Sequence, residues 1–281
     1  MVKFTISVIS IINNYDVAKR YLLKGLNGQT AKYELLLIDN AASVYTSGSK
    51  ANNDASLKAN GDYLMFIHQD VLLRSKDALK QVEDSLSTLS KVGLASAVGM
   101  IKPKFINQYE AYARYLLLLG LGMPHLWFLR YGRGNNLHGS SMSPWGGRFI
   151  TDPTCVQTVD EFFLTVPTKI FENTKFDEVT CPDWHLFGTD FSLSIQRKGY
   201  KVYVLPISVI HRSRGTISVP YVRTLAKVLE KHETEKVVNT PWGLYPTNPS
   251  FRSLCAKIGE KVGWPYGREI SGRNLLYQEN A

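Results

Sequence analysis

An uninterrupted apolar stretch, Tyr63–Ile67, ends abruptly in the polar triplet His68-Gln69-Asp70. Because the stretch is rich in strand-forming residues and contains nothing polar, it predicts a buried strand. A buried strand delivers the residues that follow it to the carboxyl edge of a sheet, where α/β folds bind ligands. Asp70 would be an oxygen ligand there for a divalent cation that carries phosphates. Alternatively, Asp70 only caps the helix that follows it.

Length and charge restrict the class of protein. The chain has 281 residues and a formal net charge of +9, which allows one large domain or two small ones. The charge favours an anionic partner such as nucleic acid, lipid headgroups or a phosphorylated small molecule. We expect no nucleic acid, because the basic residues are scattered and no helix-turn-helix, zinc-finger or RNP motif is visible. The bland alternative is a solvated basic surface.

Cysteine spacing and the N-terminus favour a cytoplasmic protein. Cys155, Cys181 and Cys255 are widely separated and form no C-x-x-C pair, so neither a disulfide framework nor a zinc knuckle is expected. The first residues enter a strand-like pattern without the charged and apolar regions of a signal peptide. A reducing compartment is therefore the expectation.

Strand-like and helix-like segments alternate in the N-terminal part of the chain. Such alternation predicts parallel strands with right-handed crossovers. The polar ends of the first three strands, Asn13-Asn14, Asp39-Asn40 and His68-Gln69-Asp70, would then lie on one edge of the sheet. The predicted strands are Phe4–Ile12, Glu34–Ile38, Asp62–Ile67 and Val92–Val98, and the predicted helices run from Asp16 to Gly28, from Ser47 to Asn60 and from Ser75 to Ser90.

The pattern is looser beyond residue 100. Tyr115–Leu129 is uncharged but contains a proline and falls short of the about 20 apolar residues that a spanning helix needs. It is either an interfacial segment that touches lipid or a buried helix and loop that cover the sheet. Asn135–Thr154, rich in Gly, Ser and Pro, predicts a long loop. Regular structure is expected again at Val156–Pro167, from Thr189 to Gly199, at Lys201–Leu205 and Ser208–Ile210, and in a basic helix over Tyr221–Val238.

In this order, the motifs resemble those of the family 2 glycosyltransferases with the GT-A fold. The resemblance covers about residues 4–215 and implies an α/β protein with a Rossmann-like mixed sheet flanked by helices. It implies a catalytic domain over 1–218, with a nucleotide-binding half (1–100) and an acceptor and catalytic half (101–218), and a C-terminal extension over 219–281. The matching stretches are Ile6–Asn14, Glu34–Asn40, Gly61–Val71, Phe176-Asp177-Glu178, Gly188-Thr189-Asp190 and the segment from Gly199 to His211.

The resemblance also implies which residues bind the donor. In the family, the ends of the first two strands hold the base and the ribose, which implicates Ile12, Asn13 and Asp39. The usual third-strand motif is Asp-x-Asp, whose last Asp binds the metal. Asp70 fits that position, whereas His68 replaces the first Asp and puts its ribose contact in doubt. A subgroup of the family carries such a triplet, and Gln69 within it is expected on the donor side.

The expected catalytic base is Asp190. The family places its base second in a Glu-Asp pair at a helix start, and here Thr189 stands where the Glu would be. A carboxylate there would take the proton of the acceptor hydroxyl, and the helix N-terminus would keep it charged. Alternatively, Asp190 is only a residue of the first helical turn.

Further expected contacts surround the metal and the acceptor. His211 is either an additional metal ligand or a structural histidine after a strand. Arg212 and Arg214 suit the leaving diphosphate, because guanidinium groups match phosphate oxygens. Glu161 is expected to contact sugar hydroxyls. Trp184 either stacks on an apolar sugar face or is a packing residue.

The resemblance thus implies an inverting, metal-dependent glycosyltransferase that uses Mn²⁺ or Mg²⁺. It would move one sugar from a nucleoside-diphosphate sugar, with UDP favoured, to a glycan, glycolipid or other hydroxyl acceptor. Single addition is expected because the Gln-x-x-Arg-Trp motif of processive synthases is absent after Asp190. The basic C-terminal region and Tyr115–Leu129 suggest peripheral contact with a membrane that carries the acceptor.

Two rival functions remain. Loss of the first Asp of the triplet and of the Glu before Asp190 is compatible with a non-catalytic nucleotide- or carbohydrate-binding protein derived from such enzymes. A sugar-phosphate nucleotidyltransferase is less compatible. It would need a glycine-rich phosphate loop after the first strand, where this chain has Asn13-Asn14-Tyr15-Asp16.

Overall fold

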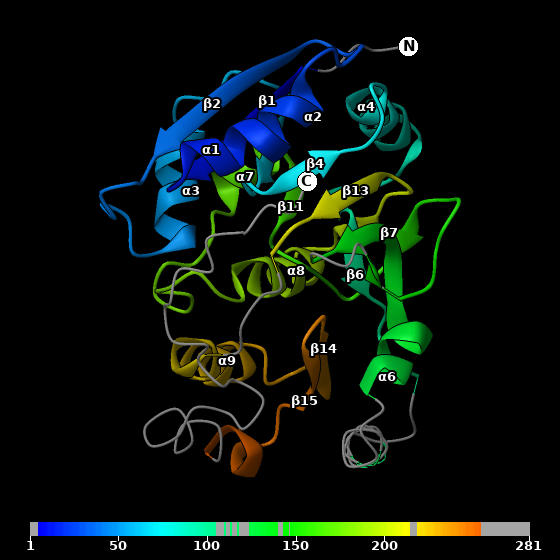
Figure 1. Cartoon of the computed structure of the whole chain (residues 1–281). Coiled ribbons are helices and arrows are strands. Elements are labelled where there is room, and N and C mark those ends of the chain that lie inside the picture. Colours follow the sequence, from blue (N-terminus) through cyan, green and yellow to red (C-terminus); the bar gives the residue numbers. More distant parts are fainter. Residues whose placement is uncertain are drawn as a thin grey trace, which may run out of the picture.

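Two mixed β-sheets, flanked by helices, form the centre of the molecule (Figure 1). The structure is a computed structural model that describes residues 5–104, 124–139, 143–145, 147–213 and 218–253, and Glu110, Ala113 and Leu117 individually. The helices are α1 (Tyr15–Ala18), a π-helical turn (Lys19–Leu23), α2 (Lys24–Leu26), α3 (Gly48–Ser56), α4 (Ala78–Thr88), α6 (Pro124–Tyr131), α7 (Thr168–Asn173), α8 (Phe187–Arg197) and α9 (Val219–Lys231).

The larger sheet has seven strands in the order β2-β1-β3-β11-β5-β12-β9. The first three are parallel, as predicted, so their carboxyl ends share one edge. Antiparallel β11 separates β3 from β5, which the purely parallel arrangement expected for the N-terminal part did not include. The strands of this larger sheet are β1 (Ile6–Ile12), β2 (Tyr33–Asp39), β3 (Tyr63–Ile67), β5 (Val92–Ser96), β9 (Thr154–Cys155), β11 (Phe163–Pro167) and β12 (Lys201–Val204).

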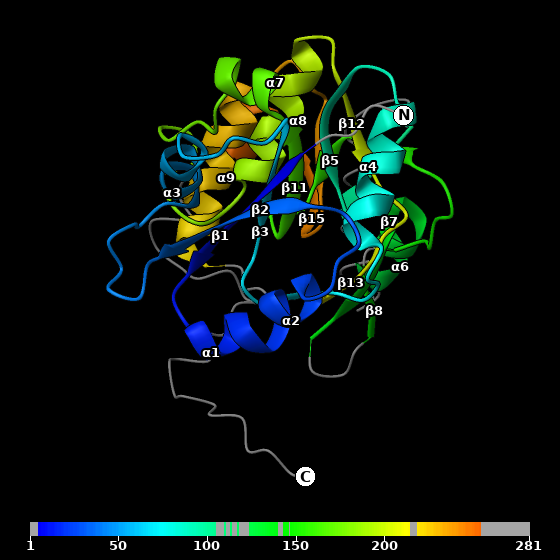
Figure 2. The same ribbon diagram turned by 90° about the horizontal axis from the view of Figure 1, so that it is seen from above.

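Alternate side chains of a strand point to opposite faces, and strands β1 and β3 are buried on both faces, whereas the edge strand β2 exposes Leu35 and Leu37. Val8 and Met65 face the core that contains Leu22 of the π-helical turn and Leu79 of α4. Ile9 and Phe66 face the other core, which contains Phe191 of α8. Figure 2 shows α1 and α2 on one side of the sheet and α7, α8 and α9 on the other. Burial on two faces explains why the strand sequences read as continuous apolar runs.

The smaller sheet has the order β10-β6-β7-β13-β4, with β8 beside β7. It corrects two expectations. The predicted strand Val92–Val98 divides between the two sheets, and part of the predicted loop Asn135–Thr154 forms β7 and β8. Asn135 exchanges hydrogen bonds of 2.8 and 2.9 Å with the backbone of Ile150 and so fixes the segment that follows. The strands are β4 (Val71–Leu73), β6 (Val98–Met100), β7 (Gly132–His138), β8 (Ser143–Trp145), β10 (Thr158–Val159) and β13 (Ser208–His211).

The predicted helix Tyr221–Val238 is too long. Helix α9 ends at Lys231, and the Val237–Thr240 segment instead forms a hairpin, β14 with β15 (Gly243–Pro246). Most of Tyr115–Leu129, Arg214 and the tail after residue 253 lie outside the described residues. Within the residues that the structure does describe, no helix combines the length and apolar character that crossing a membrane requires.

A buried ion pair joins α8 to the end of α9. The Asp190 carboxylate, 2% exposed, lies 2.7 Å from the Lys231 ammonium and 2.7 Å from Nε2 of His232. Lys231 also reaches Asp177 at 2.9 Å. Without Asp190, Lys231 would keep only Asp177 as a counter-charge, and the buried Nε2 of His232 would lose its partner, which is costly. Asp190 therefore holds the end of α9 against α8.

We expect Asp190→Asn to lower the free energy of unfolding by about 1–3 kcal/mol, because Lys231 would keep only Asp177 as a counter-charge and the buried Nε2 of His232 would lose its charged partner. Urea denaturation followed by circular dichroism measures the loss. The control is Asp54→Asn, which removes an exposed carboxylate paired with Lys50 within α3 and should leave the midpoint nearly unchanged. Equal stability of Asp190→Asn and the parent would contradict a structural role for this pair.

Candidate functional site

The ends of β1 and β3 are fastened together by one side chain. Oε1 of Gln69 accepts hydrogen bonds from the backbone N–H groups of Asn13 and Asn14, both at 3.0 Å. Its amide donates to Oδ1 of Asn13 at 2.5 Å. On the other side of β1, Ile12 pairs in register with Asp39 of β2. The three polar strand ends therefore meet on one edge, as the sequence predicts.

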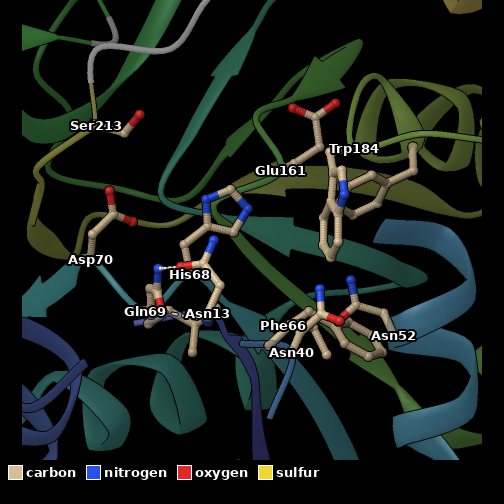
Figure 3. A pocket seen from close by; sticks show the side chains of 13 residues that line it. Asn13, Asn40, Asn52, Phe66, His68, Gln69, Asp70, Glu161, Trp184 and Ser213 are labelled. Atoms are coloured by element: carbon tan, nitrogen blue, oxygen red, sulfur yellow. Dashed lines mark hydrogen bonds between the residues drawn. The ribbon is translucent and has the colours of Figure 1, made fainter. Parts of the chain in front are cut away.

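A cavity of about 310 Å³ opens at this edge. A volume of that size suits a small molecule or part of a larger one. Figure 3 shows amide side chains, the indole of Trp184 and two carboxylates around it. Its lining residues are Ile11, Asn13, Asn40, Asn52, Phe66, Ile67, His68, Gln69, Asp70, Glu161, Trp184, Phe187 and Ser213.

Three side chains beside the cavity could share a metal ion. The candidate ligand atoms of His68, Asp70 and His211 all lie within 4.8 Å of one another. Nε2 of His211 lies 3.5 Å from Oδ1 of Asp70, which is too long for a hydrogen bond. Neither ring nitrogen of His211 has a hydrogen-bond partner among the described residues. A buried imidazole without such partners fits a ligand position.

Strand register brings these distant residues together. In the antiparallel pair of β4 and β13, His211 lies opposite Val71, the neighbour of Asp70. The backbone N–H of Arg212 donates to the carbonyl of Asp70 at 3.1 Å, which continues the ladder. The ring of Phe162 stacks on His211 with 4.4 Å between centroids, and the Phe162 carbonyl accepts the N–H of His68 at 3.0 Å.

The charge state of Asp70 also suits a cation. Burial by itself would raise the pKa of this carboxyl, but His211 and His68 outweigh that effect and lower the pKa to about 2. Asp70 is therefore ionised at neutral pH. One carboxylate oxygen with two imidazoles is a donor set that Mn²⁺ accepts. The residues present thus fit a divalent transition metal.

Glu161 is the other carboxylate that lines the cavity. It follows β10, and its Oε1 is shielded from solvent without a hydrogen-bond partner among the described residues. Burial, reinforced by neighbouring Asp160, raises the pKa of Glu161 to about 8. Trp184, 41% exposed, lines the cavity too. The structure therefore brings together the two residues predicted for the acceptor.

Other predicted site residues lie elsewhere. Asp190 does not line the cavity, because both of its oxygens face Lys231 and His232 in the protein interior. Ile12 belongs to the buried core. Asp39 is exposed and accepts the N–H of Ala41 at 2.8 Å. Arg212 follows β13 directly after His211, one of the candidate metal ligands. Arg214 lies outside the described residues.

Two residues that line the cavity, Asn40 and Asn52, were not among the predicted site residues. Asn40 holds the loop after β2 through hydrogen bonds of 3.0 and 2.7 Å with the backbone of Tyr45. Asn52 is buried on α3, a helix whose buried residues include Ser49 and Asn53. The polar residues on the buried face of α3 could have indicated this, because buried polar side chains need hydrogen-bond partners or line a site.

Comparisons with known proteins agree with this architecture. The solved structure of GalNAc-T7 with UDP, GalNAc and Mn²⁺ is similar with a TM-score of 0.53 at 14% identity, covering 81% of this chain and 48% of that one. This chain thus spans about half the length of that neighbour. A mannosyltransferase of Pyrobaculum calidifontis, PcManGT, in complex with GDP-Man and Mn²⁺ gives 0.52 at 13% identity, covering 91% and 69%.

These two likenesses confirm the predicted fold, a mixed α/β sheet of the GT-A glycosyltransferase type. No curated protein matches the sequence. The sequence model of one family does match, over residues 6–238, which spans both sheets, the cavity and the candidate metal ligands. The chain therefore belongs to the glycosyltransferase-like family that this model describes.

Proposed function

We propose that the protein is an inverting, metal-dependent glycosyltransferase that transfers one sugar from a nucleoside-diphosphate sugar to a hydroxyl group. The observation that carries the proposal is the cluster of His68, Asp70 and His211 beside the cavity at the strand ends. Membership of a glycosyltransferase-like family supports it. The two structural neighbours were solved with Mn²⁺ and with UDP or GDP-Man. We favour a UDP-sugar donor, and a glycan or lipid-linked acceptor.

Each part of the cavity has a role in this proposal. A divalent cation held by His68, Asp70 and His211 would neutralise the charge that develops on the leaving diphosphate. Asn13, Gln69 and the strand end at Asp39 would bind the base and ribose, with Arg212 and Arg214 near the phosphates. Asn40 and Asn52 add amide donors and acceptors to the same wall. Trp184 offers an apolar surface for a sugar face.

The proposed reaction also needs a general base that accepts the proton of the acceptor hydroxyl. Asp190, the base expected from the family motif, would have to leave Lys231 and His232 before it could accept a proton from an acceptor. It would also have to reach the cavity, which it does not line. The environment of Asp190 therefore favours its alternative role as a structural residue of α8.

The alternative function is a non-catalytic nucleotide- or carbohydrate-binding protein. The observation behind it is that Asp190 is engaged in the interior, while His68 stands where relatives carry an aspartate. Binding of a nucleotide sugar without release of nucleoside diphosphate would favour this alternative.

Donor binding is tested by a thermal-shift screen of UDP-, GDP- and dTDP-sugars with and without Mn²⁺. A ligand that binds only the native state, at about 100 times its dissociation constant, adds about 2.7 kcal/mol to stability. We expect one nucleotide class to raise the melting temperature, and only with the metal. Asp70→Asn should abolish the metal-dependent part, whereas the matched control Asp54→Asn should keep it. Equal shifts with and without Mn²⁺ in the parent would refute metal-mediated binding.

Metal choice is tested by His68→Asp. Imidazole ligands favour Mn²⁺ over Mg²⁺, which prefers oxygen. We expect the variant to bind Mg²⁺ more tightly relative to Mn²⁺ than the parent does, because a carboxylate oxygen replaces the imidazole nitrogen. Calorimetric titration of each metal in the presence of the selected nucleotide measures both. An unchanged preference would exclude His68 from the metal's coordination.

Peripheral membrane contact is proposed through α6. This helix exposes Leu126 (39%) and Leu129 (55%) next to Arg130, a pairing suited to an anionic interface. We expect co-sedimentation with phosphatidylserine-containing vesicles at low salt, weakened in a Leu126→Ser, Leu129→Ser double variant. Leu57→Ser, at a 72% exposed leucine beside α3, serves as the control. No sedimentation of the parent at low salt would end this idea.

A further inference from the structure

Glu161 lies in a turn between β10 and β11, and this turn contacts the candidate metal ligands His68 and His211. The next residue, Phe162, stacks on His211 and accepts the backbone N–H of His68. Among the residues that line the cavity, Asp70 and Glu161 are the carboxylates. In the view of Figure 3 they lie on either side of the His68 imidazole. Asp70 is thus one of the candidate metal ligands, whereas Glu161 is not and could take another role in the reaction.

The start of α8 makes room for Glu161. A Cβ atom on Gly188 would lie 3.1 Å from Cγ of Glu161 and 3.5 Å from its Cα, so glycine permits this close approach. The backbone N–H groups of Leu186 and Gly188 favour the ionised form of Glu161 and partly offset the effect of burial. Leu186 adopts a left-handed conformation with φ of 63°. That conformation costs energy in a residue with a side chain. Here Leu186 directly precedes α8, whose first turn contains Gly188 and lies against Glu161.

An unpartnered oxygen within this enclosed position is also costly. Oε1 of Glu161 is shielded and has no hydrogen-bond partner among the described residues. The protein keeps a carboxylate there although an apolar side chain would pack without that penalty. Because Oε1 is out of reach of solvent, an acceptor hydroxyl in the cavity would approach the carboxylate through its other oxygen. Glu161 thus places an acidic side chain in the cavity wall next to Trp184.

We propose that Glu161 is the general base of the glycosyl transfer, an inference that rests on the proposed function. Its carboxylate takes the proton of the acceptor hydroxyl. The acceptor oxygen forms a bond to the anomeric carbon while the bond from that carbon to the diphosphate oxygen breaks. The electron pair of the broken bond leaves with the nucleoside diphosphate. Glu161, now protonated, returns its proton to solvent after the products depart.

The environment of Glu161 supports this role. A general base works best when its pKa lies near the working pH, and the raised pKa of Glu161 makes it a stronger base than an exposed glutamate. Trp184 borders the same cavity, so an acceptor sugar that packs against the indole lies within the cavity that Glu161 lines. Asp190 offers no comparable access, because Lys231 and His232 occupy its oxygens.

The test measures release of nucleoside diphosphate from the sugar nucleotide selected by thermal shift, with Mn²⁺ and with water as the acceptor. We expect Glu161→Gln to lose about 10²- to 10⁴-fold in rate, the usual contribution of a general base. Its donor- and metal-dependent rise in melting temperature should persist, which shows that it is folded and binds. Glu172→Gln, at an exposed carboxylate of α7, is the matched control and should retain the parental rate.

Azide distinguishes a base from a structural residue. Azide attacks the anomeric carbon without losing a proton, so it needs no general base. We expect added azide to accelerate nucleoside diphosphate release by Glu161→Ala and to yield a glycosyl azide detectable by mass spectrometry, with no such acceleration in Glu172→Gln. A parental rate in Glu161→Gln, or failure of azide to accelerate Glu161→Ala, overturns the proposal for Glu161.

Failure of the proposed function has a different signature. In that case no sugar nucleotide raises the melting temperature of the parent with Mn²⁺, or the parent binds one and releases no nucleoside diphosphate. Loss of activity that is confined to the Glu161 variants, with azide acceleration in Glu161→Ala, supports both proposals together.

Discussion

The antiparallel pairing of β4 with β13 positions the candidate metal ligands. Because Val71 lies opposite His211, the residue before β4 meets the end of a strand far along the chain. Side chains of a strand alternate between faces, so a slip of one residue would turn His211 away from Asp70. The register is held by the Arg212–Asp70 backbone hydrogen bond and by Phe162 packed on the His211 ring.

Environment separates the carboxylates of this molecule into different roles. Asp70 lies beside imidazoles that favour its charged form. Asp190 is also ion-paired, but to groups that hold α9 in place. Glu161 has neither kind of partner and retains a high pKa. Residue type alone therefore does not assign function here, because the same chemical group occurs among the candidate metal ligands, in a helix contact and in the cavity wall.

The N-terminal half was predictable because its signals are local. Strands buried on both faces are continuous apolar runs, and their polar ends mark one sheet edge, as Asn13 and Gln69 illustrate. The rest depends on contacts that are distant in sequence. Strand β7 contains glycine and asparagine and becomes a strand only by pairing with β6 and β13, since tertiary context overrides weak strand propensity. The partners of Asp190 likewise come from a helix whose packing the sequence does not reveal.

The turn formed by Asp160, Glu161 and Phe162 connects the candidate metal ligands to the part of the cavity wall that contains Glu161. The ring of Phe162 stacks on His211 and its carbonyl accepts the N–H of His68, while Glu161 lines the cavity. Any displacement of this turn would move the candidate metal ligands and the proposed base at the same time. Selection for a new acceptor or a new cation would therefore act on both properties together, and variants that adapt to one are expected to require compensating changes for the other.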